Sequence, residues 1–306
     1  ARSDAVAARW AEGPVHRRFA EAMRALPAPR AEAVADAIRT IFADDGWVDA
    51  LVATLARAMR EDPFFAVPFR HINSDVHTGV IVYEDDKVSI AAGVSQAPLL
   101  AAKKNRARGS LSVAFSGQVS VMKFVKGGRA RLSFWEIDPI TADFTAAGAG
   151  TCRSTGERLI ADGDILTVDG RSQSFVIEHA ASNLLVLQAT VKPDQAPLSV
   201  EYDAHTRAYV GCSAADDSAS RIQMITTLLR KLGAERAFPA MAEFVEHPNF
   251  FVRWHVMREL LGLDAVAALP HLKRMAARDP HPETRRCARI VLDRLEAGAL
   301  TCQRAA

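Results

Sequence analysis

The sequence has few cysteines, almost no net charge and no long apolar run. Its four cysteines, Cys152, Cys212, Cys287 and Cys302, are widely spaced and include no Cys-x-x-Cys pair. This spacing is typical of free thiols in a reducing compartment and excludes a small disulfide scaffold. No apolar stretch reaches the roughly 18 to 20 residues that span a bilayer, and the first residues lack the basic-then-apolar order of a signal peptide. We therefore expect a soluble, cytoplasmic protein with no membrane partner.

The composition excludes several broad classes of protein. Hydrophobic residues make up 49% of the chain, charged residues 24%, and the formal net charge is +2. These values are ordinary for globular proteins and exclude wholesale disorder, collagen and coiled coils. The chain has 306 residues, whereas single hydrophobic cores stop growing at about 250 to 300 residues. We therefore expect two or three domains.

The first segment, residues 1–69, predicts helices. In residues 34–42 the apolar side chains recur at the i, i+3, i+4 and i+7 spacing of one buried helix face. Pro27-Ala28-Pro29 and Asp44-Asp45-Gly46 interrupt the pattern. The predicted helices cover residues 6–26, 30–42 and 47–60.

In the second segment, residues 70–218, the apolar period changes from 3.6 to 2. Short apolar runs alternate with turn sequences such as Lys126-Gly127-Gly128 and Asp162-Gly163, which predict hairpins. Short strands without intervening helices predict an antiparallel sandwich or barrel. The predicted strands cover residues 78–83, 87–94, 118–125, 129–137, 157–160, 164–168, 173–178, 184–191, 198–202 and 207–212.

In the third segment, residues 219–306, the 3.6 period returns and a motif repeats. Pro239 and Pro270 lie 31 residues apart, and Arg253 and Arg285 lie 32 residues apart. Short repeats of paired helices are typical of solenoids, in which neighbouring pairs bury their apolar faces against each other.

This repeat resembles HEAT repeats. Each copy has a proline near the start of its first helix, a turn that ends in proline, and an arginine at the start of its second helix. Asp279 is the acidic turn residue of the second copy, whereas the first copy has His247 in the turn. The resemblance implies that Arg253 and Arg285 are structural and that the domain binds a protein partner. Because the helix dipole disfavours cations near a helix start, we expect carboxylates or carbonyls around both arginines.

The middle segment resembles a cupin, a small double-sheet jelly roll. The resemblance rests on residues 159–175, which contain a Gly163-Asp164 turn followed by an apolar strand, and on the return strand at residues 183–190. The resemblance implies an antiparallel barrel that encloses a small site.

The histidines that bind the metal of a cupin are missing from this chain. The expected histidine position falls on Gln173 or Ser174, and Asp169 stands where a proline is expected. The His-x-His pair is also missing, because no histidine occurs between Val88 and Gly128. Lysine and arginine do not replace neutral imidazole as ligands at neutral pH. We therefore predict no metal cofactor and no catalytic residues in the barrel.

A displaced metal site is the alternative. If residues 70–77 are extended, His71, Asp75 and His77 share one face, and Gln173 is a further candidate ligand. Two histidines and a carboxylate suit Fe, Mn or Zn, and such a site would make the protein a cupin-type, dioxygenase-like oxidoreductase. The same residue types also mark a loop that leads into the first strand.

Two further groups of residues are candidate binding sites. Arg131, Trp135 and Glu136 could orient an anion or an aromatic ring in a small-molecule pocket, although Trp135 could equally pack in the core.

The second group is the basic run formed by Lys103, Lys104, Arg106 and Arg108. An exposed loop of this kind contacts an acidic protein surface or phosphates, or is simply solvated. Residues 219–306 hold 14 basic and 9 acidic residues. Because interleaved aromatic residues are absent, we do not expect a nucleic-acid partner.

The sequence thus predicts an α+β multidomain protein with three parts. A helical N-terminal segment (1–69) and a HEAT-like α-helical domain (219–306) flank an antiparallel, cupin-like β jelly roll (70–218). The function that fits these parts is that of a non-catalytic binding or regulatory protein with a metal-free barrel. We expect a protein partner, and a small-molecule ligand and a homo-oligomer are both consistent with the pattern.

Overall fold

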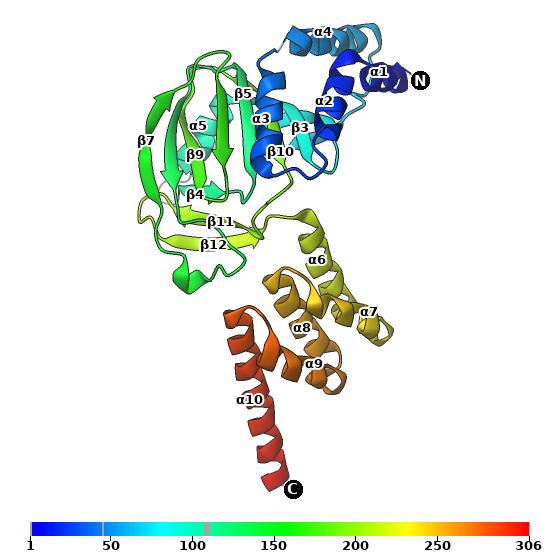
Figure 1. Ribbon diagram of the computed structural model, residues 1–306, viewed down its shortest axis with the longest axis vertical. Helices are drawn as coiled ribbons and strands as arrows, with labels where there is room; N and C mark the ends of the chain where they lie inside the picture. The colour runs from blue at the N-terminus through cyan, green and yellow to red at the C-terminus, as the bar shows by residue number, and fades with distance from the viewer. Residues whose placement is uncertain (1, 45, 107–110, 306) are drawn as a thin grey trace. The chain divides into compact units, whose positions relative to one another are not determined.

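The computed structural model describes residues 2–44, 46–106 and 111–305 (Figure 1). The chain forms two compact units, which we call the sandwich unit, residues 1–139 and 150–212, and the helical unit, residues 140–149 and 213–306. The N-terminal helices and the strands therefore belong to one unit. Ten residues from the middle segment, Ile140–Ala149, belong to the helical unit instead. The boundaries at residues 69 and 218 remain a prediction.

Helices open the sandwich unit. They are α1 (Arg2–Ala11), α2 (Pro14–Arg24), α3 (Ala31–Phe42) and α4 (Gly46–Glu61). The single helix predicted over residues 6–26 is two helices, because Pro14 has no N–H to continue the first one and begins the second instead. No helix among the residues that the structure describes combines the length and apolar composition of a membrane span.

The strands of this unit form antiparallel sheets. One sheet has the order β1-β2-β3-β10-β5-β8, and two smaller sheets have the orders β12-β11-β4 and β7-β6-β9. The smaller sheets adjoin each other, because β4 contacts β9. The strands are β1 (Arg70–Asn73), β2 (His77–Glu84), β3 (Val88–Ser95), β4 (Ser112–Phe115), β5 (Val119–Lys126), β6 (Arg131–Glu136), β7 (Arg153–Leu159), β8 (Ile165–Asp169), β9 (Gln173–His179), β10 (Leu184–Val191), β11 (Leu198–Asp203) and β12 (Tyr209–Ala214).

Several turns predicted as hairpins connect different sheets. The turn at Lys126-Gly127-Gly128 joins β5 to β6, yet β5 pairs with β10 and β8, and β6 pairs with β7 and β9. The Asp162-Gly163 turn likewise joins β7 of one sheet to β8 of another. These hairpin predictions are wrong, because a turn sequence specifies a change of direction but not the strand that the chain pairs with afterwards. Repeated crossing between two layers is what makes the sandwich a jelly roll.

A helix also interrupts the strands, contrary to the prediction. Helix α5 (Ala97–Arg106) lies between β3 and β4. Its alanines, leucines and lysines favour helix, and Pro98 occupies a position in the first turn where no N–H is needed. Asn183 Oδ1 accepts a hydrogen bond of 3.1 Å from the N–H of Ala97.

The larger sheet buries one face under the N-terminal helices. Alternate residues of its central strands, including Val121 and Leu187, pack with Val34, Ile38 and Phe42 of α3 in one apolar cluster, and α3 lies against β5 and β10 (Figure 1). Successive side chains of a strand point to opposite faces. The residues between these buried ones therefore face the interior of the sandwich.

Two charged side chains of the strand region hold the ends of α3. The N–H of Ala31, at the start of the helix, donates to Asp194 Oδ2 at 2.9 Å. At the other end, Lys123 Nζ of β5 donates to the carbonyl oxygen of Phe42 at 2.7 Å. The anion and the cation each lie at the end of the helix dipole that they stabilise. The buried Lys123 thus has a structural role in fixing the helix on the sheet.

The helical unit contains the predicted repeat. Helices α7 and α8 form the first pair, and α9 and α10 form the second, preceded by α6. The elements are η1 (Ala146–Gly148), α6 (Asp217–Lys231), η2 (Glu235–Ala237), α7 (Phe238–Ala242), η3 (Glu243–Glu246), α8 (Phe250–Leu263), α9 (Ala265–Arg278) and α10 (Pro282–Ala305).

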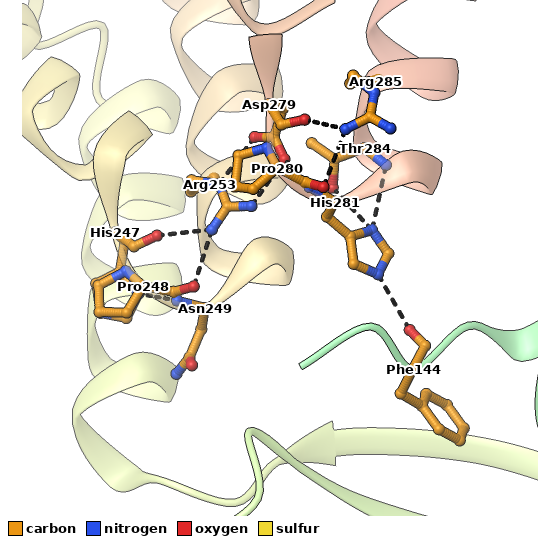
Figure 2. A network of polar contacts seen from close by, with 10 residues as sticks. All are labelled: Phe144, His247, Pro248, Asn249, Arg253, Asp279, Pro280, His281, Thr284 and Arg285. Carbon is orange, nitrogen blue, oxygen red and sulfur yellow. Dashed lines mark hydrogen bonds and ion pairs between the residues drawn. The ribbon is translucent and has the colours of Figure 1, made fainter. Parts of the chain in front are cut away.

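Arg253 ties the two helix pairs together (Figure 2). Its guanidinium donates to both carboxylate oxygens of Asp279, at 2.8 and 2.7 Å, and to the carbonyl oxygens of His247 and Pro248, at 2.9 and 2.8 Å. Arg285 donates in the same way to the carbonyl oxygens of Asp279 and Pro280. A carboxylate and carbonyl oxygens therefore surround Arg253, and carbonyl oxygens accept from Arg285, in agreement with the predicted carboxylates or carbonyls.

The segment Ile140–Ala149 contacts this network through His281. The carbonyl oxygen of Phe144 is only an acceptor, so His281 Nε2 donates to it, at 3.2 Å (Figure 2). Nδ1 of the same ring then accepts from the N–H of Thr284, and the ring stacks on Phe250 at 3.8 Å between centroids. His281 thus fixes the inserted segment to the start of α10.

We predict that Lys123→Met lowers the free energy of unfolding of the sandwich unit. The substitution keeps the length of the side chain but leaves the last carbonyls of α3 without this donor, which costs about 1–3 kcal/mol. Lys126→Met, on the same strand but exposed, is the matched control and should change stability by less than about 0.5 kcal/mol. Urea denaturation followed by circular dichroism measures both. Equal effects of the two substitutions would contradict the role assigned to Lys123.

We further predict that Arg253→Met destabilises the helical unit by about 3–5 kcal/mol, because it leaves the buried carboxylate of Asp279 without its cation. Hydrogen exchange measured by mass spectrometry should show loss of protection in both α8 and α9. The control is Arg286→Met, which removes an exposed arginine of α10 that pairs with Glu283 at 3.6 Å. Retained protection in the Arg253 variant would show that the pair does not join the repeats.

Candidate functional site

The sandwich unit contains a partly open cavity of about 760 Å³. Residues of the large sheet, of strands β4, β9 and β11, and of helix α5 line it. This volume lies within the range of about 300–1,000 Å³ that is usual for small-molecule pockets. The cavity is therefore the candidate functional site.

Small residues on the inner face of β2 and β3 create much of this space. Ala91, Gly93 and Ser95 alternate along β3 and line the cavity, and Gly79 of β2 pairs with Gly93. A Cβ atom on Gly79 would lie 2.7 Å from the carbonyl oxygen of Ala92. Glycine is thus required where the two strands approach most closely, and it leaves the volume in front of them open.

Larger apolar side chains form the remaining wall. Met122 and Phe124 of β5 and Val186 of β10 line the cavity, together with Ile177 of β9 and Leu100 of α5. The same residues belong to an apolar cluster of the sandwich. They offer a ligand a hydrophobic surface with no hydrogen-bonding requirement.

A polar group lies at the ends of β2 and β3. His77, the first residue of β2, pairs in register with Ser95, the last residue of β3, and Ser95 Oγ lies 2.6 Å from His77 Nδ1. Burial lowers the pKa of His77 below its ordinary value of 6.5, and the positive charge of Lys103 lowers it further. The imidazole is therefore neutral at neutral pH, and its Nδ1 shares a hydrogen bond with Ser95 Oγ.

Lys103 of α5 is the cation of this group. It lines the cavity one helical turn after Leu100, and its Nζ lies 4.0 Å from Asp75 Oδ2. The Lys103 and Asp75 side chains are 64% and 86% exposed, and ion pairs this exposed contribute little to stability. Nζ therefore remains accessible to a competing anion.

The structure separates the residues of the predicted alternative metal site. His77 and Gln173 line the cavity, whereas His71 and Asp75 are exposed residues outside it. Gln173 Nε2 lies 3.5 Å from Glu136 Oε1. Within residues 2–44, 46–106 and 111–305, no group of three or more His, Cys, Asp or Glu residues is close enough to hold a metal ion. The residues present do not fit the iron or manganese that a cupin resemblance implies.

The three predicted pocket residues of β6 lie outside the cavity lining. Arg131 forms an exposed ion pair with Glu157 at 3.6 Å. Trp135 Nε1 donates to Ser133 Oγ at 3.1 Å, and Glu136 contacts Gln173. A binding role for Arg131, Trp135 and Glu136 therefore remains a prediction, and it would concern a site other than this cavity.

The basic run lies in α5 rather than in the predicted loop. Lys103, Lys104 and Arg106 belong to the last turns of this helix, and Arg108 lies outside the described residues. Lys103 contributes to the cavity instead of forming only a partner surface.

Sequence reasoning did not identify Ser95 or the inner face of β3. The signal that could have found them is the run of small residues at every second position, Ala91, Gly93 and Ser95, in an otherwise apolar strand. Small residues on one face of a strand indicate a space or a close backbone approach.

A family model described as HEAT repeats matches residues 211–293, and this match confirms the predicted repeat. No curated protein sequence matches the chain.

The chain is also similar to several solved structures. It is 12% identical to the ectoine synthase from P. lautus, with a TM-score of 0.23, over 40% of this chain and 69% of that one. It is 9% identical to a sugar phosphate isomerase from a cupin superfamily from Silicibacter pomeroyi, with a TM-score of 0.26, over 47% and 79% of the two chains. It is 12% identical to an oxalate decarboxylase from Lactobacillus farciminis, with a TM-score of 0.27, over 45% of this chain and 34% of that one.

These similarities assign no activity to the chain. The strand order gives an antiparallel jelly roll, and the family match gives HEAT repeats after it, so the fold is the mixed α+β arrangement that the sequence predicts.

We predict that Lys103→Gln raises the pKa of His77, because a positive charge that disfavours the imidazolium is removed. Titration of the histidine ring signals by NMR measures this pKa, with Lys126→Gln as a control of equal charge change. An unchanged His77 pKa in the Lys103 variant would contradict the proximity of the two groups.

The lowered pKa of His77 also predicts how stability depends on pH. Since the unfolded chain binds this proton at higher pH than the folded protein, the free energy of unfolding should decrease as the pH falls below about 6.5.

Proposed function

We propose that this chain is a non-catalytic binding or regulatory protein. In this proposal the jelly roll binds a small, mainly apolar molecule without a metal, and the HEAT-like helices bind a protein partner. The observation that carries the proposal is the cavity of about 760 Å³, which has an apolar wall as well as hydroxyl, amide and charged side chains.

The lining supports binding rather than metal-dependent chemistry. A transition metal in a cupin needs several imidazole and carboxylate ligands directed at one point. Among the described residues of the lining, His77 is the one histidine and Glu201 the one carboxylate. Amide and hydroxyl groups such as those of Gln173, Gln188 and Ser95 orient a ligand by hydrogen bonds and are poor ligands for iron or manganese.

The helical unit supports the partner half of the proposal. Helix α6 packs on α8 through Ala219 and Ile222, but its other side exposes apolar side chains. Met224, Leu228 and Leu232 are 71%, 55% and 70% exposed, and these positions recur every four residues along one helix face. An exposed apolar stripe on a helical repeat is typical of an interaction surface.

The cytoplasm is the compartment that we propose. Cys152, Cys212 and Cys287 are free thiols in the part of the chain that the structure describes, which suits a reducing environment.

The direct test combines the metal content with the binding of an apolar probe. We expect the purified protein, after dialysis, to contain no stoichiometric iron, manganese or zinc by elemental analysis. We expect octan-1-ol to bind in isothermal titration calorimetry. Ala91→Leu, which fills part of the cavity, should weaken this binding at least about tenfold because the added methylenes occupy the ligand volume.

Ala33→Leu is the matched control, since Ala33 is an exposed residue of α3 outside the cavity lining. It should leave octan-1-ol binding unchanged. One equivalent of tightly held metal, or octan-1-ol binding that Ala91→Leu does not affect, would refute the proposed function.

A further inference from the structure

We infer that the ligand carries one carboxylate at the end of its apolar body, and that Lys103, His77 and Ser95 bind this carboxylate. The inference rests on the proposed binding function and names the chemical class of the ligand.

Lys103 supplies the charge. Leu100 and Lys103 are three residues apart on α5 and both line the cavity, so one helix face presents an apolar residue and then a cation. Leu100 packs against the apolar cluster that contains Phe124 and Val186. A ligand whose apolar body contacts this cluster would therefore place its terminal group near Lys103 Nζ.

His77 and Ser95 supply a directional donor beside that charge. Ser95 is buried, and its hydroxyl lies 2.6 Å from His77 Nδ1. We assign the tautomer in which Nδ1 accepts from Ser95, and in this tautomer the ring carries its proton on Nε2. The backbone N–H of His77 donates to Ser74 Oγ at 3.1 Å, which fixes the main chain at the start of β2. Nε2–H and the Lys103 ammonium together match the two oxygens of a carboxylate.

The competing anion near Lys103 is easily displaced. Asp75 lies 4.0 Å from Nζ, and its side chain is 86% exposed, so both groups lose little when a ligand separates them. A carboxylate whose apolar body is held by the cavity wall would be fixed beside the same ammonium, whereas the exposed Asp75 side chain is not held there.

Glu201 is an acidic residue of the lining, and it allows a test of whether the ligand is an anion or a cation. It lines the cavity from β11, in the other layer of the sandwich. Among the described residues of the lining, Lys103 and Glu201 are the two permanently charged side chains. A cationic ligand would depend on Glu201, whereas an anionic one depends on Lys103.

The experiment compares three probes of the same length, which are octanoate, octan-1-ol and octylammonium. Isothermal titration calorimetry should show that octanoate binds to the full-length protein at least about tenfold more tightly than octan-1-ol. Lys103→Gln should weaken octanoate at least tenfold and change octan-1-ol by less than twofold. Lys126→Gln, which removes an exposed lysine outside the cavity, should leave all three affinities unchanged, and Lys103→Arg should restore most of the octanoate affinity.

A second measurement detects the protonation of His77 when octanoate binds. A bound carboxylate favours the imidazolium form of His77, so octanoate should raise the His77 pKa and cause proton uptake near neutral pH. Titrations in two buffers of different ionisation enthalpy detect this uptake, and His77→Gln should abolish it. Absence of proton uptake in the unmodified protein would overturn the assignment of His77.

Other outcomes also decide between the claims. Equal binding of octanoate and octan-1-ol, each weakened by Ala91→Leu, would overturn the inference and leave the proposed binding function intact. Tightest binding of octylammonium with loss in Glu201→Gln would reverse the sign of the ligand charge and also overturn it. If none of the probes binds, the proposed function fails, and the inference fails with it.

Discussion

The attachment of α3 to the large sheet is the interaction on which the sandwich unit depends. Asp194 holds the positive end of this helix and Lys123 its negative end, while the apolar side chains between these ends pack on the outer face of the sheet. Since this face is already covered, the opposite face is free to line a cavity. The N-terminal helices therefore contribute to the site, because they cover the face of the sheet that does not line the cavity.

The cavity of the jelly roll has a lining of two kinds. Small residues on β3 provide room, and apolar residues of β5 and β10 provide a hydrophobic wall. The described residues of the lining do not form the cluster of imidazoles and carboxylates that a metal requires. Instead, the neutral His77 lies beside Ser95 and Lys103 at the ends of β2 and β3. This distribution matches an elongated ligand with a single polar group better than it matches metal-dependent chemistry.

The sequence predicted the positions of most strands, and for the HEAT-like repeat it also predicted the role of Arg253. Local periodicity and turn residues carry that information. It did not predict which strands pair, because the turns after β5 and β7 specify only a reversal of direction. It placed Lys103 in a loop, although the alanines and leucines around it favour helix. The contact between His77 and Ser95 joins residues on different strands, and the register that brings them together is a property of the folded sheet.

The central claim is that the sandwich cavity binds an apolar carboxylate without a metal. A crystal structure of the full-length protein with octanoate tests it most directly. The account predicts the hydrocarbon chain against Met122 and Phe124, and the carboxylate within about 3 Å of Lys103 Nζ and His77 Nε2. A metal ion coordinated in the cavity, or octanoate bound only outside it, would contradict the account.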